Sequence, residues 1–80
     1  MTQVVLLTTT DCGFCEQAKE VLGRLAAEYK LDVSEVPLSS QQGKQLARAA
    51  RAPFPPVVLI DGVPFSYGRL SERKLRKALA

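Results

Sequence analysis

Two cysteines, Cys12 and Cys15, are the residues of this 80-residue chain whose type and spacing most clearly indicate chemistry. They belong to one motif, Cys12-Gly13-Phe14-Cys15, which follows an apolar run and precedes a helical pattern. The N–H groups at a helix start lack partners within the helix, so a thiolate on Cys12 would be stabilised there. Thiolates attack disulfides, and Cys15, one turn along, is within reach to form a disulfide and release a bound partner. The motif therefore predicts thiol–disulfide exchange, with Cys12 as the nucleophile.

Asp11, directly before Cys12, has two opposed consequences for this chemistry. Its carboxylate opposes thiolate formation while the helix start favours it, and the sign of the net effect stays open at this level. Aspartate is also a good N-cap residue, so we expect Asp11 to cap the helix and to direct its charge at backbone donors.

Other roles for the cysteine pair are alternatives to redox chemistry. A permanent disulfide over four residues would constrain the unfolded chain little, and a reducing cytoplasm disfavours it. A closed zinc site needs four ligands, and the chain has no histidine and no third cysteine. Zinc or an iron–sulfur cluster would therefore have to be held between two protomers. The pair could also be unused, in an inactive interaction module.

The spacing of apolar residues predicts the elements that position the motif. Apolar runs at 4–7 and 57–60 are typical of strands covered on both faces. Steps of three and four from Ala18 to Tyr29 predict a helix. Pro37 and Pro64 remove ladder donors, so their strands are expected at sheet edges. The order strand, helix, strand, helix, strand, strand, helix predicts an α/β fold with a four-stranded mixed sheet and three flanking helices.

Shorter signals predict where the later elements begin. Ser39 and Gln42 have capping-box spacing, so a short helix is expected with Ser39 as its N-cap. Gly43 lies inside that helix and should cost about 1 kcal/mol relative to alanine. The pair Asp61-Gly62 predicts a two-residue hairpin turn, and the final helix is expected to begin near Ser71.

Length and composition indicate a single domain spanning residues 1–80. Hydrophobic residues make up 46% and charged residues 24%, as in ordinary soluble proteins. No apolar run approaches the ~20 residues of a membrane span, and residues 1–3 lack the basic charge of a signal peptide. We therefore expect a cytoplasmic protein without a membrane partner. The net charge of +3 is concentrated in the last twelve residues, without aromatic residues between the basic ones, so nucleic acid is not an expected partner.

The chain resembles, over essentially its whole length, the glutaredoxin-like branch of the thioredoxin superfamily. The resemblance rests on the strand, the Cys12-Gly13-Phe14-Cys15 motif and the helix that follows, on residues 56–62 (Pro-Val-Val-Leu-Ile-Asp-Gly), and on the closing helix. It implies a thioredoxin-like fold and a thiol–disulfide oxidoreductase whose catalytic residues are Cys12 and Cys15. It implies neither a metal nor an organic cofactor.

The resemblance also indicates where a substrate would bind. In that family the proline at the position of Pro56 is cis, packs against the redox cysteines and leaves the preceding N–H and carbonyl for an extended peptide. Pro55 has no N–H to donate to such a peptide. Both Pro53 and Pro55 are expected to be ordinary loop prolines. The substrate-contact candidates are Phe14, Pro55, Pro56, Tyr67 and Arg69. Of these, Tyr67 is expected to serve strand packing rather than substrate binding. Arg69 is expected to be a solvated side chain beside the last helix rather than a contact for an anionic partner or the thiolate.

Two departures from the family bear on the partner. Glutaredoxins tend to carry a lysine three residues before the first cysteine, where this chain has Thr9. They also hold glutathione with a Gly-Gly-x-Asp-like segment, whereas residues 66–71 here contain no acidic residue. These departures favour a thioredoxin reductase-type reductant over glutathione. The expected partners are disulfide-containing proteins or small molecules, and the protein is expected to be a monomer.

Overall fold

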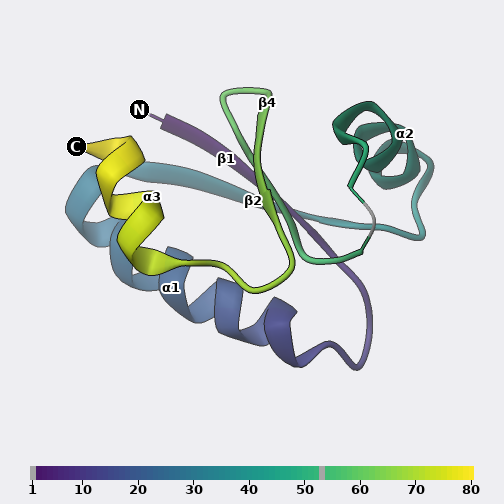
Figure 1. Cartoon of the computed structure of the whole chain (residues 1–80), viewed down its shortest axis with the longest axis horizontal. Coiled ribbons are helices and arrows are strands. Elements are labelled where there is room, and N and C mark those ends of the chain that lie inside the picture. The colour runs from purple at the N-terminus through teal and green to yellow at the C-terminus, as the bar shows by residue number, and fades with distance from the viewer. Residues whose placement is uncertain (1, 53) are drawn as a thin grey trace.

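The computed structural model describes residues 2–52 and 54–80, which form four strands and three helices (Figure 1). In chain order these are β1 (Thr2–Thr8), α1 (Gly13–Tyr29), β2 (Leu31–Pro37), α2 (Gln41–Ala50), β3 (Val57–Ile60), β4 (Val63–Tyr67) and α3 (Glu72–Leu79). This confirms the order of elements predicted from the sequence. The expectation that Pro53 is an ordinary loop proline falls outside the described residues.

The strands form a mixed sheet in the order β2-β1-β3-β4. β1 runs parallel to β2 and antiparallel to β3, and β4 runs antiparallel to β3. The two uniformly apolar strands are thus central, and the strands that contain Pro37 and Pro64 lie at the edges, as predicted. Asp61 and Gly62 join β3 to β4 with φ angles of 49° and 81°, the left-handed backbone that a tight hairpin turn requires.

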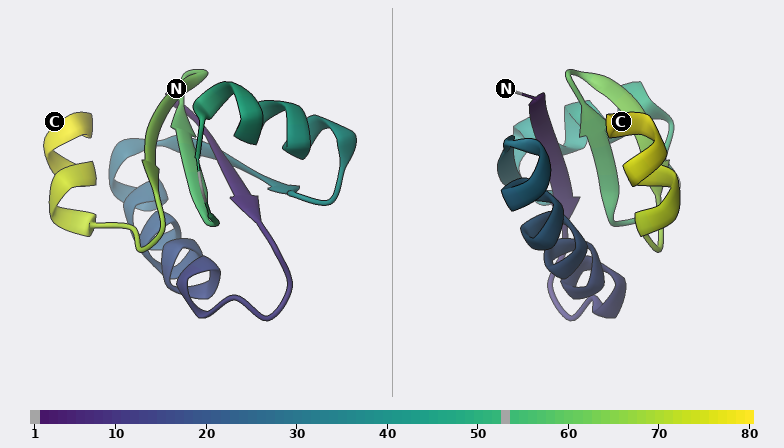
Figure 2. Two further views of the ribbon diagram at one scale, coloured as in Figure 1. Left: turned by 45° about the vertical axis from the view of Figure 1, so that its right-hand side comes forward. Right: turned by 90° about the vertical axis from the view of Figure 1, so that its left-hand side faces the viewer.

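The helices cover the sheet from both sides, α1 and α3 on one face and α2 on the other (Figure 2). Side chains of α1 and α3 pack with one set of strand residues; its buried members are Val4, Leu6, Ala18, Val21, Leu22, Leu25, Leu31, Val58, Leu70 and Leu75. On the other face Leu7, Val57 and Leu59 pack beneath α2. No helix formed by the described residues is long and apolar enough to cross a membrane.

The predicted N-cap of α2 is wrong by one residue. Ser40, rather than Ser39, has the extended backbone of a cap, and its hydroxyl accepts a hydrogen bond from the N–H of Gly43 at 2.9 Å. The cause is the end of β2: the Pro37 carbonyl accepts hydrogen bonds from both the N–H and the hydroxyl of Ser40, at 3.1 and 2.7 Å. The predicted start of the last helix is confirmed, since Ser71 is the N-cap of α3.

Candidate active site

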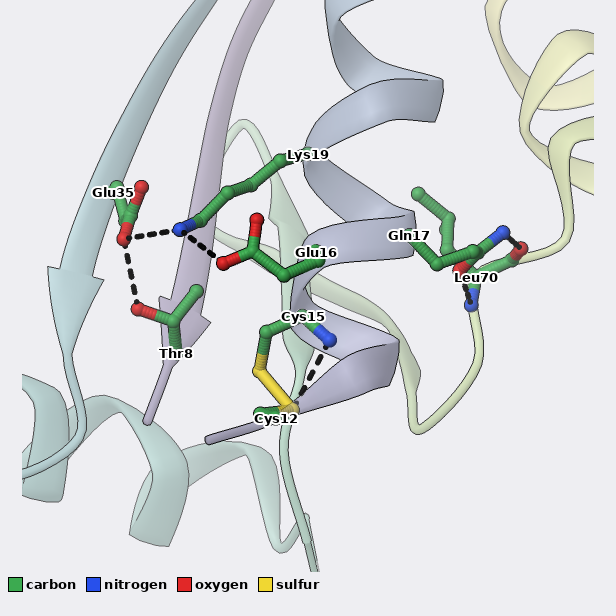
Figure 3. Close-up of a disulfide and its surroundings, with 8 residues drawn as sticks. All are labelled: Thr8, Cys12, Cys15, Glu16, Gln17, Lys19, Glu35 and Leu70. Atoms are coloured by element: carbon green, nitrogen blue, oxygen red, sulfur yellow. Dashed lines mark hydrogen bonds and ion pairs between the residues drawn. A yellow bond between two sulfur atoms is a disulfide. The ribbon is translucent and has the colours of Figure 1, made fainter. Parts of the chain in front are cut away.

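Cys12 and Cys15 are joined by a disulfide where the chain passes from β1 into α1 (Figure 3). Cys12 is the N-cap residue of α1, and its sulfur accepts a hydrogen bond from the N–H of Cys15 at 3.0 Å. The prediction that Asp11 caps this helix is therefore wrong. Asp11 is exposed in the preceding turn with a φ of 53°, whereas the extended backbone that a cap needs belongs to Cys12.

The two sulfur-bearing residues differ in exposure. Cys15 faces inward from α1 and is 1% exposed, whereas Cys12 is only partly buried. An incoming disulfide therefore has access to Cys12 rather than to Cys15. The order of attack itself stays a prediction.

The proline segment lies at the start of β3, beside the start of α1 in each view of the fold (Figures 1 and 2). The peptide bond between Pro55 and Pro56 is cis, as the family resemblance implied, and Pro56 is fully buried. The Pro56 carbonyl accepts a hydrogen bond from the N–H of Gly68 at 2.8 Å, which ties this segment to the end of β4. Pro55 is partly buried and has no N–H.

Gln17, which the sequence analysis did not single out, connects α1 to the loop before α3 through hydrogen bonds. Its side-chain amide donates to the Leu70 carbonyl at 2.9 Å and accepts from the Leu70 N–H at 3.2 Å (Figure 3). The amide thus pairs with both backbone groups of Leu70, as a neighbouring strand would. Because the partner is backbone 53 positions away, nothing local in the sequence indicates this contact.

Exposed aromatic rings occur in and near these segments. Phe14, within the cysteine motif, is 52% exposed. Phe54 and Tyr67 are 53% and 52% exposed, although they pack edge to face with their ring centroids 5.3 Å apart. The Phe54 ring also lies over Gly68, where an added Cβ would come 2.8 Å from the ring atom Cε2. Tyr67 thus packs against Phe54, a residue that the candidate set did not include.

A family model for the glutaredoxin-like domain (DUF836) matches residues 3–80. The chain belongs to this glutaredoxin-like family. Uncharacterized proteins of Mycobacterium bovis and Mycobacterium tuberculosis are each 35% identical to it over 80 residues, covering 98% of this chain and 82% of the relative. Membership of this family, together with the cysteine disulfide, supports a redox role.

Solved structures support the thioredoxin-like fold class. A thioredoxin-like protein from Clostridium perfringens has a TM-score of 0.77 at 17% identity, covering 99% of this chain and 68% of that one. Mitochondrial thioredoxin 3 from Saccharomyces cerevisiae has a TM-score of 0.72 at 18% identity, covering 98% and 76% of the two chains. At these identities the likeness shows the fold alone.

A polar groove of about 520 Å³ lies between the cysteine motif and the end of β2. In the wall of this groove the Lys19 ammonium forms ion pairs with the carboxylates of Glu16 and Glu35, each at 3.4 Å (Figure 3). Hydrogen bonds to Glu16 and then to Glu35 raise the pKa of Lys19 above its ordinary value. The Thr8 hydroxyl also donates to Glu35 at 3.1 Å. Lys19 therefore offsets part of the negative charge beside the cysteines, while the Asp11 carboxylate also lines the groove.

Arg69 lies on a second groove, of about 410 Å³, between α1 and the start of α3. Its side chain is exposed and forms no ion pair with any residue that the structure describes. The backbone at Arg69 is nonetheless constrained by hydrogen bonds on both sides. Gly68 is hydrogen-bonded to Pro56, and Leu70 is hydrogen-bonded to Gln17.

Within residues 2–52 and 54–80, no group of three or more Cys, His, Asp or Glu side chains is arranged to hold a metal ion.

Proposed function

We propose that this glutaredoxin-like protein is a thiol–disulfide oxidoreductase, which reduces or exchanges the disulfides of proteins or small molecules through Cys12 and Cys15. The observation that carries the proposal is the hydrogen bond from the Cys15 N–H to the Cys12 sulfur at 3.0 Å. When the disulfide is reduced, the same N–H and the positive end of the α1 dipole stabilise a thiolate at Cys12. The partial exposure of Cys12 lets that thiolate meet a substrate.

The cycle begins when the Cys12 thiolate attacks one sulfur of the substrate disulfide. A bond forms between Cys12 and that sulfur, the substrate S–S bond breaks, and a first substrate thiolate leaves. Cys15, having lost its proton, then attacks Cys12 and releases the second substrate thiolate as the protein disulfide forms. Two electrons pass from the protein dithiol to the substrate, and the two cysteine protons go to solvent or to the released thiolates. An external dithiol reverses the protein's oxidation by the same exchange.

Single serine variants test the order of attack. Each variant is reduced, freed of reductant and mixed with hydroxyethyl disulfide, and the products are resolved by intact-protein mass spectrometry. Cys12→Ser should show no reaction. Cys15→Ser should accumulate a mixed disulfide, seen as the added mass of one mercaptoethanol. Reaction at equal rates in the two variants would contradict the assignment of Cys12 as the nucleophile.

We assign recycling to a thioredoxin reductase-type reductant in the cytoplasm, acting on a monomer. The absence of an acidic residue from 66–71, and Thr9 in place of the family's lysine, support this choice over glutathione. The test uses two reaction mixtures that contain the oxidised protein and NADPH, one with thioredoxin reductase and the other with glutathione plus glutathione reductase. NADPH consumption is followed in each. Faster consumption with thioredoxin reductase is expected. Faster consumption with glutathione would refute the reductant and leave the dithiol cycle intact.

A further inference from the structure

Asp11 places a carboxylate directly before Cys12, and the fold does not use that carboxylate as a helix cap. Cys12 itself is the N-cap of α1. Asp11 lies in the preceding turn with a φ of 53° and is exposed. It forms no ion pair with any residue that the structure describes. The negative charge of Asp11 is therefore left uncompensated beside the proposed nucleophile.

The groove that Asp11 lines has an excess of negative charge. Its charged groups are the carboxylates of Asp11, Glu16 and Glu35 and the ammonium of Lys19, which give a net charge of −2. Lys19 is already paired with Glu16 and Glu35, at 3.4 Å each. The other lining residues are threonines, one serine and one proline, which carry no charge. A group that approaches Cys12 from this side therefore meets a negative field to which Asp11 makes an unpaired contribution.

The groove on the other side of α1 has the opposite sign. It is lined by Arg24, Arg69 and Glu72, of which Arg24 and Glu72 pair at 2.6 Å, so the unpaired charge is that of Arg69. Arg69 is far from Cys12 along the chain, whereas Asp11 is joined to it by one peptide bond. In every rotamer the Asp11 carboxylate thus stays within about 10 Å of the Cys12 sulfur. This is about the screening length of ~0.1 M salt, so a charge on an incoming substrate is affected by Asp11.

We propose that Asp11 determines which disulfides Cys12 attacks, favouring those with positive charge beside the sulfur and disfavouring anionic ones. This inference rests on the proposed function and names the class of its substrates. As the Cys12 thiolate forms a bond to one substrate sulfur and the other leaves as a thiolate, the groups on the bonded sulfur come close to Asp11. Ammonium or guanidinium groups are attracted there, and carboxylates are repelled. Suitable substrates are small disulfides with amino groups and protein disulfides flanked by lysine or arginine.

The test compares three small disulfides that differ in charge. Cystamine carries two ammonium groups, hydroxyethyl disulfide is neutral, and dithiodiglycolate carries two carboxylates. Pre-reduced protein is mixed with each at neutral pH and low ionic strength, quenched with a thiol-alkylating reagent and weighed by mass spectrometry, which gives a second-order rate constant for oxidation of the dithiol. Because the three disulfides differ in intrinsic reactivity, each variant's constant is divided by the wild-type constant for the same disulfide.

Asp11→Asn should slow the reaction with cystamine about threefold and accelerate that with dithiodiglycolate about threefold, both relative to hydroxyethyl disulfide, because unit charges about 7 Å apart in water interact by about RT. A change in the reactivity of Cys12 affects all three disulfides alike and cancels in this comparison. Asparagine tolerates the left-handed backbone, so the turn should be retained. Salt at about 1 M, with a screening length of ~3 Å, should remove most of the difference between wild type and variant.

Two further variants control for net charge and for the sign of the field. Asp61→Asn makes the same change at another exposed aspartate with a positive φ, 49°. Asp61 is bonded to Gln3 at the start of β1, the end of the strand remote from Cys12, so the relative rates should stay as in the wild type. Lys19→Gln removes the cation of the groove and should shift the relative rates in the direction opposite to Asp11→Asn. Circular dichroism and thermal unfolding verify that each variant folds.

The outcomes separate this inference from the proposed function. Equal effects of Asp11→Asn on all three disulfides would mean that Asp11 acts on the thiolate alone. Equal shifts in Asp11→Asn and Asp61→Asn would mean that the net charge of the whole protein decides. Either result overturns the inference while the dithiol exchange stands. If the wild type reacts with none of the three disulfides, the proposed function itself fails.

Discussion

Replacing Gly43 by alanine should destabilise the protein, although the same change in the middle of an exposed helix normally stabilises it. Gly43 is buried in the first turn of α2, against the end of β2. A Cβ built on it would overlap the Pro37 carbonyl oxygen and come 2.9 Å from Pro37 C and 3.0 Å from Leu38 Cα. These neighbours are backbone atoms, so no flexible side chain can move aside.

The size of the effect follows from two opposed contributions. Alanine in place of glycine within a helix gains about 1 kcal/mol. Forcing an extra carbon into a packed site typically costs about 1–3 kcal/mol. Moving the Pro37 carbonyl would also disturb the bonds that it accepts from the N–H and hydroxyl of Ser40, each contributing about 1 kcal/mol. The expected net loss is about 1–3 kcal/mol.

Gly23 in α1 is the matched control. It is exposed, and a Cβ there would meet no atom within 4 Å. Gly23→Ala should therefore gain the full helix preference of about 1 kcal/mol. Thermal unfolding of the oxidised proteins should show a Tm raised by about 4–8 °C for Gly23→Ala and lowered for Gly43→Ala. If Gly43→Ala raised Tm as much as Gly23→Ala, the packing argument would be refuted.

Two further predictions concern a helix cap and an ion pair. Ser40→Ala should destabilise the protein by about 1 kcal/mol in urea unfolding, and Ser39→Ala should have little effect; equal effects would contradict the observed cap. Hydrogen bonds from Arg76, at 2.6 and 3.1 Å, hold the pKa of Glu28 below its ordinary 4.5. A carboxyl whose pKa is lower in the folded than in the unfolded protein stabilises the fold at any pH above its unfolded-state pKa. That stabilisation is lost as the pH falls through the folded-state pKa. The Tm difference between wild type and Arg76→Ala should therefore be largest near neutral pH and shrink below pH 4.5. The Tm difference between wild type and the control Arg73→Ala, whose arginine is exposed, should not shrink in this way. An Arg76→Ala difference independent of pH would exclude this role for Glu28.

The architecture was predictable because it depends on patterns that a few neighbouring residues carry. Continuous apolar runs at 4–7 and 57–60 identified the central strands, since both of their faces are covered by helices. Pro37 and Pro64 identified the edges because a missing N–H is tolerated there. The location of the cysteine motif between β1 and α1 could be predicted because the apolar residues before it form a continuous run, whereas those after it recur at helical spacing.

The helix caps were less predictable because adjacent residues offer equivalent groups. Ser39 and Ser40 carry the same hydroxyl, and the choice between them depends on where β2 ends and how its last carbonyl is bonded. At α1 the side chain with the stronger capping preference, Asp11, takes a left-handed turn position, and the sulfur of Cys12 becomes the cap. The cap therefore coincides with the candidate nucleophile.

The walls of the candidate site could not be predicted because their contacts join distant segments. Gln17 reaches Leu70 from the redox helix, and the Gly68 N–H reaches the carbonyl of Pro56. These bonds fix the backbone on both sides of Arg69 while its side chain stays exposed. A contact between Arg69 and an incoming partner would therefore need movement of the side chain alone. The cysteine motif defines the chemistry locally, whereas the surface available to a substrate depends on how the later half of the chain folds against α1.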